Sequence, residues 1–369
     1  MRMQNLQAKN IHATFSLPVA LSKAKGDAKN TVSGLAYVTD TETGFTRRKS
    51  KSGFLFFDLA GKRLRAKDAI NRIQSLVIPP AWSDVWICPL AHGHLQATGR
   101  DARGRKQYIY HPQFRELRES DKYQHMLQFA QTLPVIRAQI RRDIGRTGLP
   151  REKVIATVIW LLEATLIRVG NAEYAKENRS YGITTLRTPH VKLQGSEIRF
   201  QFRGKSGKAW KISLHDRRIA KIIRACQELP GQQLFQYEDA TGALLTITST
   251  DVNRYLQELT GKEITAKDFR TWAGTVMAAS ILHEGDVTQG DSRQRHIREA
   301  VKVVSERLGN TPTICRKCYI HPIILDLYTD DKLRLRVIQK TTAPAALEPI
   351  ERAVLALLKR QARITAANR

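Results

Sequence analysis

Tyr319, near the C-terminal end of the chain, carries a side chain that could act as a nucleophile. A phenol attacks a phosphodiester only if it is held in line and if cations neutralise the charge on the pentavalent phosphorus. Because the ordinary pKa of a phenol is about 10, these cations must also favour the phenolate as it forms. The sequence offers three candidate cations and one neutral hydrogen-bonding residue for this chemistry: Arg168, Lys205, Arg270 and Asn310.

Two of these residues follow segments with regular apolar patterns. Apolar residues recur at helical spacing over residues 154–166, which predicts a helix that ends just before Arg168. Apolar and polar residues alternate over residues 198–203 and 210–214, which predicts a β-hairpin with Lys205 in its turn.

Arg270 and Asn310 lie near the ends of predicted helices. A capping-box sequence at residues 265–268 predicts the start of a helix that carries Arg270 in its second turn. The next helix is expected to stop at Gly309, a favourable residue after a helix end, which leaves Asn310 at the start of a loop.

Each candidate also has an ordinary structural interpretation. Arg168 is favourable at a helix C-terminus because of the helix dipole. Lys205 is typical of a solvated turn, Arg270 has Asp268 nearby as an ion-pair partner, and Tyr319 is compatible with a core position. Taken singly, the residues do not decide between these interpretations and catalysis.

The composition points to a polyanionic partner. The chain has 61 Lys and Arg against 34 Asp and Glu, a formal net charge of +27, which predicts binding to nucleic acid through counterion release. With 42% hydrophobic residues in 369, it has enough apolar material for one large or two moderate cores. No run of residues approaches the roughly 20 apolar residues of a membrane span, so we expect a soluble protein.

The four cysteines do not form a recognisable framework. Cys315 and Cys318 make a CxxC with His321 close by, but the sequence has no second CxxC to complete a zinc site. We therefore expect two thiols packed on a helix, with no metal and no cofactor.

The fold class predicted from these patterns is α+β. Short aromatic segments and turn residues from about 30 to 115 indicate a β-rich module, and helical spacing begins at about 121. We predict four parts: a basic flexible tail at 1–30, a small β-rich domain at 31–118, a larger mainly α-helical catalytic domain with a β-hairpin at 119–345, and a basic amphipathic tail helix at 346–369.

Several stretches, in order from about residue 33 to 325, resemble the type IB DNA topoisomerases, specifically the compact poxvirus-like group and its bacterial relatives. The resemblance extends over most of the chain and rests on these stretches: 78–82 (IPPAW), 96–108 (QATGRDARGRKQY), 167–174 (IRVGNAEY), 202–208 (FRGKSGK), 267–272 (KDFRTW) and the segment that ends at Tyr319.

The resemblance implies a catalytic role for each candidate. Tyr319 would attack the DNA phosphodiester to give a 3′-phosphotyrosyl link, Arg168 and Arg270 would clamp the non-bridging oxygens, and Lys205 would protonate the departing 5′-oxygen. The poxvirus enzymes have histidine where this chain has Asn310, so no proton transfer is expected at that position. Resealing would need neither ATP nor a metal.

The resemblance also implies a monomer that clamps double-stranded DNA, in the cytoplasm and associated with the bacterial nucleoid. DNA contacts are expected from Arg105, Lys106, Gln107, Tyr108, Tyr174, Lys176 and Lys267. On a regular strand Lys106, Tyr108 and Tyr110 share one face, so residues 105–108 cannot all touch bases unless the strand bends or twists.

Two alternatives stay open at this point. A tyrosine recombinase uses a similar pocket, but the β-rich N-terminal segment resembles the topoisomerases instead. A non-catalytic DNA-binding protein of the same fold is the other, although all five pocket positions hold workable chemistry.

Overall fold

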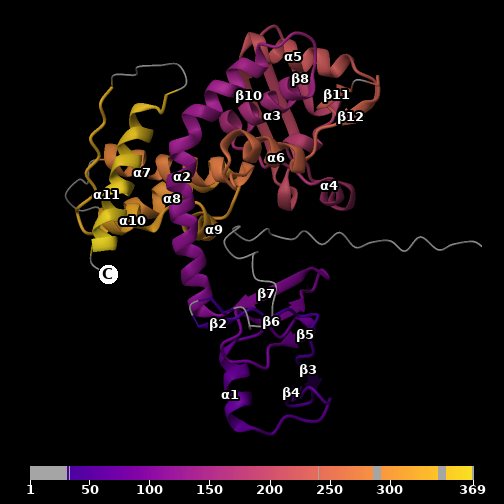
Figure 1. Cartoon of the computed structure of the whole chain (residues 1–369), viewed down its shortest axis with the longest axis vertical. Helices are drawn as coiled ribbons and strands as arrows, with labels where there is room; N and C mark the ends of the chain where they lie inside the picture. Colours follow the sequence, from indigo (N-terminus) through magenta and orange to yellow (C-terminus); the bar gives the residue numbers. More distant parts are fainter. Residues whose placement is uncertain (1–30, 33, 240, 286–291, 340–345, 368–369) are drawn as a thin grey trace, which may run out of the picture. The chain divides into compact units, whose positions relative to one another are not determined.

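The computed structural model describes residues 31–32, 34–239, 241–285, 292–339 and 346–367. The chain divides into two compact units, Met1–Lys122 and Tyr123–Arg369, and the boundary falls inside the long helix α2 (Figure 1). The predicted tail at 1–30 lies outside the described residues, and the four-part division stays a prediction. Within the described part of the chain, no helix is long and apolar enough to cross a membrane.

The first unit is built on an antiparallel sheet of five strands in the order β4-β3-β5-β6-β7. Its small core contains Ile73, Val85, Ile87 and Ala97. The β-rich prediction is confirmed, whereas the helix α1 was not predicted. The elements are β1 (Thr31–Val32), β2 (Leu35–Ala36), β3 (Phe45–Ser50), β4 (Gly53–Phe57), α1 (Lys67–Ser75), β5 (Ser83–Ile87), β6 (Leu95–Arg100) and β7 (Lys106–Tyr110).

The second unit is mainly helical, with small antiparallel sheets, and this confirms the α+β class. Its helices are α2 (Pro112–Ile144), α3 (Arg151–Thr165), α4 (Ala172–Asn178), α5 (Arg217–Glu228), α6 (Ser249–Thr260), α7 (Ala266–Glu284), α8 (Arg293–Leu308), α9 (Pro312–Cys318), α10 (Pro322–Thr329) and α11 (Pro349–Ala367). Its strands are β8 (Val191–Gln194), β9 (Glu197–Arg203), β10 (Ala209–His215), β11 (Gln236–Glu238) and β12 (Leu244–Thr246).

The predicted hairpin is β9 and β10, which pair with Phe202 opposite Trp210 and Phe200 opposite Ile212. Burial alternates along β9, because its apolar side chains face the core and its polar ones face water. The strand β8 joins the other side of β9 and was not predicted. Lys205 lies in the turn of the hairpin, as expected.

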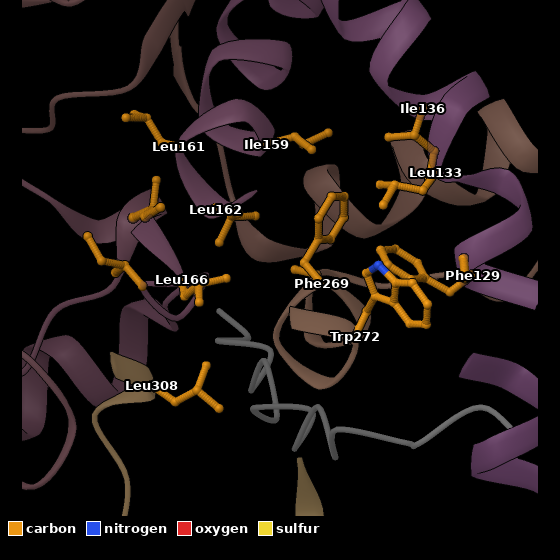
Figure 2. Packing of buried hydrophobic residues seen from close by; sticks show 14 of the residues in the cluster. Phe129, Leu133, Ile136, Ile159, Leu161, Leu162, Leu166, Phe269, Trp272 and Leu308 are labelled. Carbon is orange, nitrogen blue, oxygen red and sulfur yellow. The ribbon is translucent and has the colours of Figure 1, made fainter. Parts of the chain in front are cut away.

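Helix α7 runs through the core of the second unit. Its start is fixed by Asp268, whose carboxylate accepts hydrogen bonds from the backbone nitrogen and the hydroxyl of Thr265. Phe269 meets Phe129 of α2 edge to face, with ring centroids 4.9 Å apart, and Trp272 lies close by (Figure 2). Burying each such side chain contributes about 1.5–3 kcal/mol, so α7 is a rigid support for whatever it carries.

The C-terminal helix α11 packs against α7 (Figure 1). Its Glu351, only 8% exposed, accepts hydrogen bonds from both terminal nitrogens of Arg137 on α2 and from Nε1 of Trp272 on α7. Arg137 also pairs with Glu163 of α3. This buried network ties four helices together, and α7 is one of them.

Candidate active site

Arg168 is placed by an abrupt end to α3. Leu166 caps this helix in the left-handed conformation, with φ +58°, which is unusual for a leucine. The chain then runs beside residues 182–185, where the backbone nitrogen of Ile183 donates to the carbonyl of Arg168 at 2.9 Å. The Arg168 side chain is therefore carried on a fixed segment just beyond the helix.

Arg270 connects the ends of two other helices. The side chain projects from α7 and is only 3% exposed. Its Nη1 donates to the carbonyl of Leu166, and its Nη2 donates to the carbonyl of Leu308 at 2.7 Å. These are the carbonyls at the C-terminal ends of α3 and α8, which lack partners within their own helices. One guanidinium thus holds together the segments that carry Arg168 and Asn310.

Asn310 directly follows the predicted helix stop. Gly309 ends α8 with φ +62°, and the backbone nitrogen of Asn310 donates to the carbonyl of Ser305 at 2.9 Å. Nη2 of Arg168 donates both to Oδ1 of Asn310 and to the carbonyl of Gly309, the latter at 3.3 Å. Arg168 and Asn310, distant in the sequence, are therefore in direct contact.

Tyr319 lies at the C-terminal end of α9, where its backbone nitrogen donates to the carbonyl of Cys315 at 3.0 Å. The Cζ of Arg270 lies 5.2 Å from the centroid of the phenol ring. The Tyr319 carbonyl accepts from Oγ1 of Thr275 at 3.3 Å. Gly274 permits this approach, because a Cβ there would lie 2.8 Å from the Tyr319 carbonyl oxygen. Helix α7 therefore positions both Arg270 and the phenol.

Lys205 shares a pocket with Arg168. The pocket has a volume of about 460 Å³, and its lining includes Tyr174 and Trp210 as well as these two cations. The turn that carries Lys205 is closed by a hydrogen bond of 2.8 Å from the backbone nitrogen of Gly204 to the carbonyl of Lys208. The Lys205 side chain is exposed to solvent.

The charges at this site are not balanced by acidic groups. Among the described residues, neither Arg168 nor Arg270 pairs with a carboxylate. Burial lowers the pKa of Arg270, the nearby Tyr319 phenol raises it, and the charge of Arg168 lowers it. Two buried donor atoms, Nε of Arg270 and Nδ2 of Asn310, have no hydrogen-bond partner. Because buried donors are normally satisfied, this arrangement fits a site that binds an anion.

The site also contains residues that the sequence did not single out for it. Cys315 is buried beneath it, and burial raises the pKa of this thiol, while the charge of Arg270 and the amide of Asn310 act in the opposite direction. The amide nitrogen of Asn310 nevertheless makes no hydrogen bond of normal geometry. Gly274 and Thr275 had no distinguishing signal in the sequence beyond the presence of a glycine in a helix.

The structure places the other predicted DNA contacts in separate groups. Tyr174 lines the same pocket as Arg168, and Lys176 lines a different pocket on α4. Lys267 is exposed in the first turn of α7. The remaining four contacts belong to the first unit.

On the edge strand β7, the expected sharing of one face is confirmed. Lys106 lies over the Tyr108 ring at 5.7 Å, and the rings of Tyr108 and Tyr110 stack 6.0 Å apart. On the other face Ile109 packs against the small core, and Gln107 donates to Asp101 at 3.0 Å.

Two of these cations form ion pairs within their own unit. Lys106 pairs with Asp40 at 2.6 Å, and Arg105 pairs with Asp101 at 2.7 Å. Both cations are exposed and can therefore reach a phosphate. Because each is already paired, it would have to leave its carboxylate partner or share it. Across the described ranges of the chain, no three His, Cys, Asp or Glu side chains cluster as metal ligands would.

Comparisons with known proteins identify the family of the chain. The family model for the catalytic core of eukaryotic DNA topoisomerase I matches residues 111–341, more than half of the chain. The model for the N-terminal domain of bacterial DNA topoisomerase IB matches residues 53–101.

Individual proteins similar to this chain are also named as DNA topoisomerases. DNA topoisomerase 1B of Acanthamoeba polyphaga mimivirus is 31% identical over 296 residues, which cover 78% of this chain and 88% of that protein. DNA topoisomerase I of monkeypox virus is 25% identical over 280 residues, which cover 74% and 86%, and DNA topoisomerase 1B of vaccinia virus (strain Copenhagen) is 24% identical over the same shares. These matches show that the chain is an isomerase that belongs to the type IB DNA topoisomerases, in their poxvirus-like and bacterial group.

Proposed function

We propose that this topoisomerase relaxes supercoiled duplex DNA by cleaving one strand with Tyr319 and then resealing it. The observation that carries the proposal is a group of cations without carboxylate partners, together with buried nitrogens without acceptors, at the site of the phenol. Arg168 and Arg270 have no carboxylate partner among the described residues, and two buried nitrogens have no hydrogen bond. A phosphodiester supplies the missing negative charge and the missing acceptors.

The two guanidiniums act on the non-bridging oxygens of the scissile phosphate. Their planar forks match a phosphoryl group, and they stay charged at any working pH. Nδ2 of Asn310 adds a neutral hydrogen bond to one of these oxygens. Because charge accumulates on these oxygens in the pentavalent transition state, donors fixed beforehand stabilise that state most.

Covalent bonds are exchanged as follows. The Oη of Tyr319 forms a bond to phosphorus while the bond from phosphorus to the 5′-oxygen breaks, and the phenolic proton passes to solvent. The departing oxygen takes a proton from Nζ of Lys205. The ester to Tyr319 conserves the bond energy, so the 5′-hydroxyl can reverse the reaction without ATP. Two guanidiniums supply the charge stabilisation that a metal ion provides in other phosphoryl-transfer sites.

The rest of the chain binds the duplex around this site. The exposed Lys106 and Tyr108 on β7, together with Arg105 and Gln107, are proposed groove and phosphate contacts of the first unit. Tyr174, Lys176 and Lys267 are proposed phosphate contacts of the second unit. The protein would act as a monomer, and in a bacterial cell its substrate would be the DNA of the nucleoid in the cytoplasm.

Relaxation of negatively supercoiled plasmid tests the proposal. The protein is incubated with plasmid in the presence of EDTA and without ATP, beside the variant Tyr319→Phe. We expect relaxation by the wild type and none by the variant, with equal DNA retention by both proteins in a filter assay. Persistent supercoiling with the wild type would refute the proposal, and so would relaxation by the variant.

A further inference from the structure

The indole of Trp210 forms a wall of the pocket that Arg168 and Lys205 share. Trp210 lies on β10, is 8% exposed, and is nearly parallel to the Phe202 ring on β9, with an interplanar angle of 4°. Many aromatic side chains of the core are as buried as Trp210, but Trp210 differs from them in the two glycines that it contacts.

Two glycines press against the nitrogen-bearing edge of this indole, at neighbouring positions. A Cβ at Gly204 would lie 2.5 Å from Nε1, on the five-membered ring, and a Cβ at Gly309 would overlap Cζ2, on the six-membered ring. Neither position leaves room for a side chain. Gly204 directly precedes Lys205, and Gly309 directly precedes Asn310. One edge of the indole is therefore in contact with both the turn of the hairpin and the end of α8.

The turn itself has little else to hold it. Residues 205–208 are exposed, and the turn hydrogen bonds, such as the 3.0 Å bond from the nitrogen of Gly207 to the carbonyl of Gly204, set its shape but not its position. The end of α8, in contrast, is fixed by Arg168 and Arg270. A rigid ring in contact with both parts sets the distance from the turn to the fixed end.

We propose that Trp210 is a positioning residue that sets the distance of the Lys205 ammonium from the phosphate held by Arg168 and Asn310. The inference rests on the proposed function, in which Lys205 protonates the departing 5′-oxygen. A displacement of about 1 Å at a reacting group can cost about 10²-fold in rate. Loss of the indole should thus impair proton donation while leaving the phosphate clamp in place.

The leaving atom offers a way to isolate this effect. When the bridging 5′-oxygen is replaced by sulfur, the phosphorus–sulfur bond breaks and the electron pair leaves as a thiolate. A thiol has an ordinary pKa of about 8.5, so the thiolate needs no proton from Lys205. A defect in proton donation is therefore rescued by the sulfur substrate, whereas a defect in phosphate binding or in folding is not.

The experiment measures single-turnover cleavage of matched duplexes with oxygen or sulfur at the 5′-bridging position. The variants are Trp210→Phe, Lys205→Ala and, as a matched control, Phe200→Leu. Phe200 is buried on the same hairpin, with 2% exposed, and is not among the nearest neighbours of a Cβ at either glycine. We expect Trp210→Phe to slow the oxygen substrate by about 10²-fold and to cleave the sulfur substrate within a few-fold of wild type, as Lys205→Ala does. Phe200→Leu should cleave both substrates at near wild-type rates.

Two other outcomes separate the possible failures. Suppose that sulfur rescues Lys205→Ala, but that Trp210→Phe either slows both substrates equally or slows neither. The inference about Trp210 is then wrong, and the proposed function stands. If sulfur does not rescue Lys205→Ala, the acid role of Lys205 is wrong, and the inference about Trp210 falls with it. Thermal unfolding of each variant verifies that it is folded at the assay temperature.

Discussion

Replacing Asn310 with aspartate exchanges one amide nitrogen of the proposed phosphate site for an oxygen of nearly the same size. Oδ1 of Asn310 already accepts from Arg168, whereas the buried Nδ2 has no partner. Asn310→Asp therefore removes the donor that we assign to a phosphate oxygen and places a carboxylate beside the guanidinium of Arg168. The new carboxylate supplies the negative charge that the substrate phosphate would otherwise supply. The cleavage rate should therefore fall, while the stability of the fold should rise.

The magnitudes follow from these contacts. Loss of one fixed donor costs about 10²- to 10³-fold in cleavage rate, and the new ion pair with Arg168 adds to the loss. For the fold, two unit charges about 4 Å apart attract by about 4 kcal/mol at an effective dielectric constant of about 20, and desolvation of the carboxylate offsets much of this. A net gain of about 1–2 kcal/mol would raise the melting temperature of a unit of this size by roughly 2–8 °C.

Single-turnover cleavage and thermal unfolding, measured on the same preparations, test this prediction. Asn310→Ala is the matched control, because it removes the amide without adding charge. It should slow cleavage by about 10²-fold and leave the melting temperature unchanged or slightly lower. If Asn310→Asp cleaves DNA within ten-fold of wild type, or if it melts below the alanine variant, the unpaired cations do not form the anion site that we describe.

Other contacts lead to three further predictions. Gly274→Ala places a methyl group against the backbone of Tyr319, so cleavage should fall by about 10²-fold while the circular dichroism spectrum is unchanged. Glu351→Gln leaves the partly buried Arg137 of α2 with one charged partner fewer, and urea denaturation should show a loss of about 3 kcal/mol. The hydrogen bond to Asp268 raises the pKa of His125, although burial opposes this. His125→Gln should therefore lose stability relative to wild type at about pH 5.5, and the difference should vanish as the pH rises through the raised pKa of His125.

Local signals in the sequence predicted the elements that carry the site. Alternation over β9 and β10 located Lys205 in a turn, because apolar side chains face the core at every second residue. The capping box before α7 and Gly309 after α8 gave two helix ends, since both act through neighbouring backbone groups. The convergence of Arg168, Asn310 and Tyr319 did not follow from any such pattern. It came from the resemblance to a family, because periodicity contains no information about which helix ends meet.

Residues that shape the site through packing left weaker signals. Leu166 adopts a left-handed conformation that leucine rarely takes, so nothing in its type indicates the turn that directs Arg168. Gly204 lies where the sequence predicts a turn, but the structure shows that it also makes room for Trp210. Close contacts of this kind depend on two distant segments at once and appear only in three dimensions.

The identity of the residue that becomes linked to DNA tests the central claim most directly. The protein is incubated with a long linear duplex, the reaction is stopped with denaturant, and the adduct is digested and analysed by mass spectrometry. The account predicts a nucleotide attached through its 3′-phosphate to the peptide that contains Tyr319, and a free 5′-hydroxyl on the other side of the nick. A link to another residue, a link to the 5′ end, or no covalent adduct at all would contradict it.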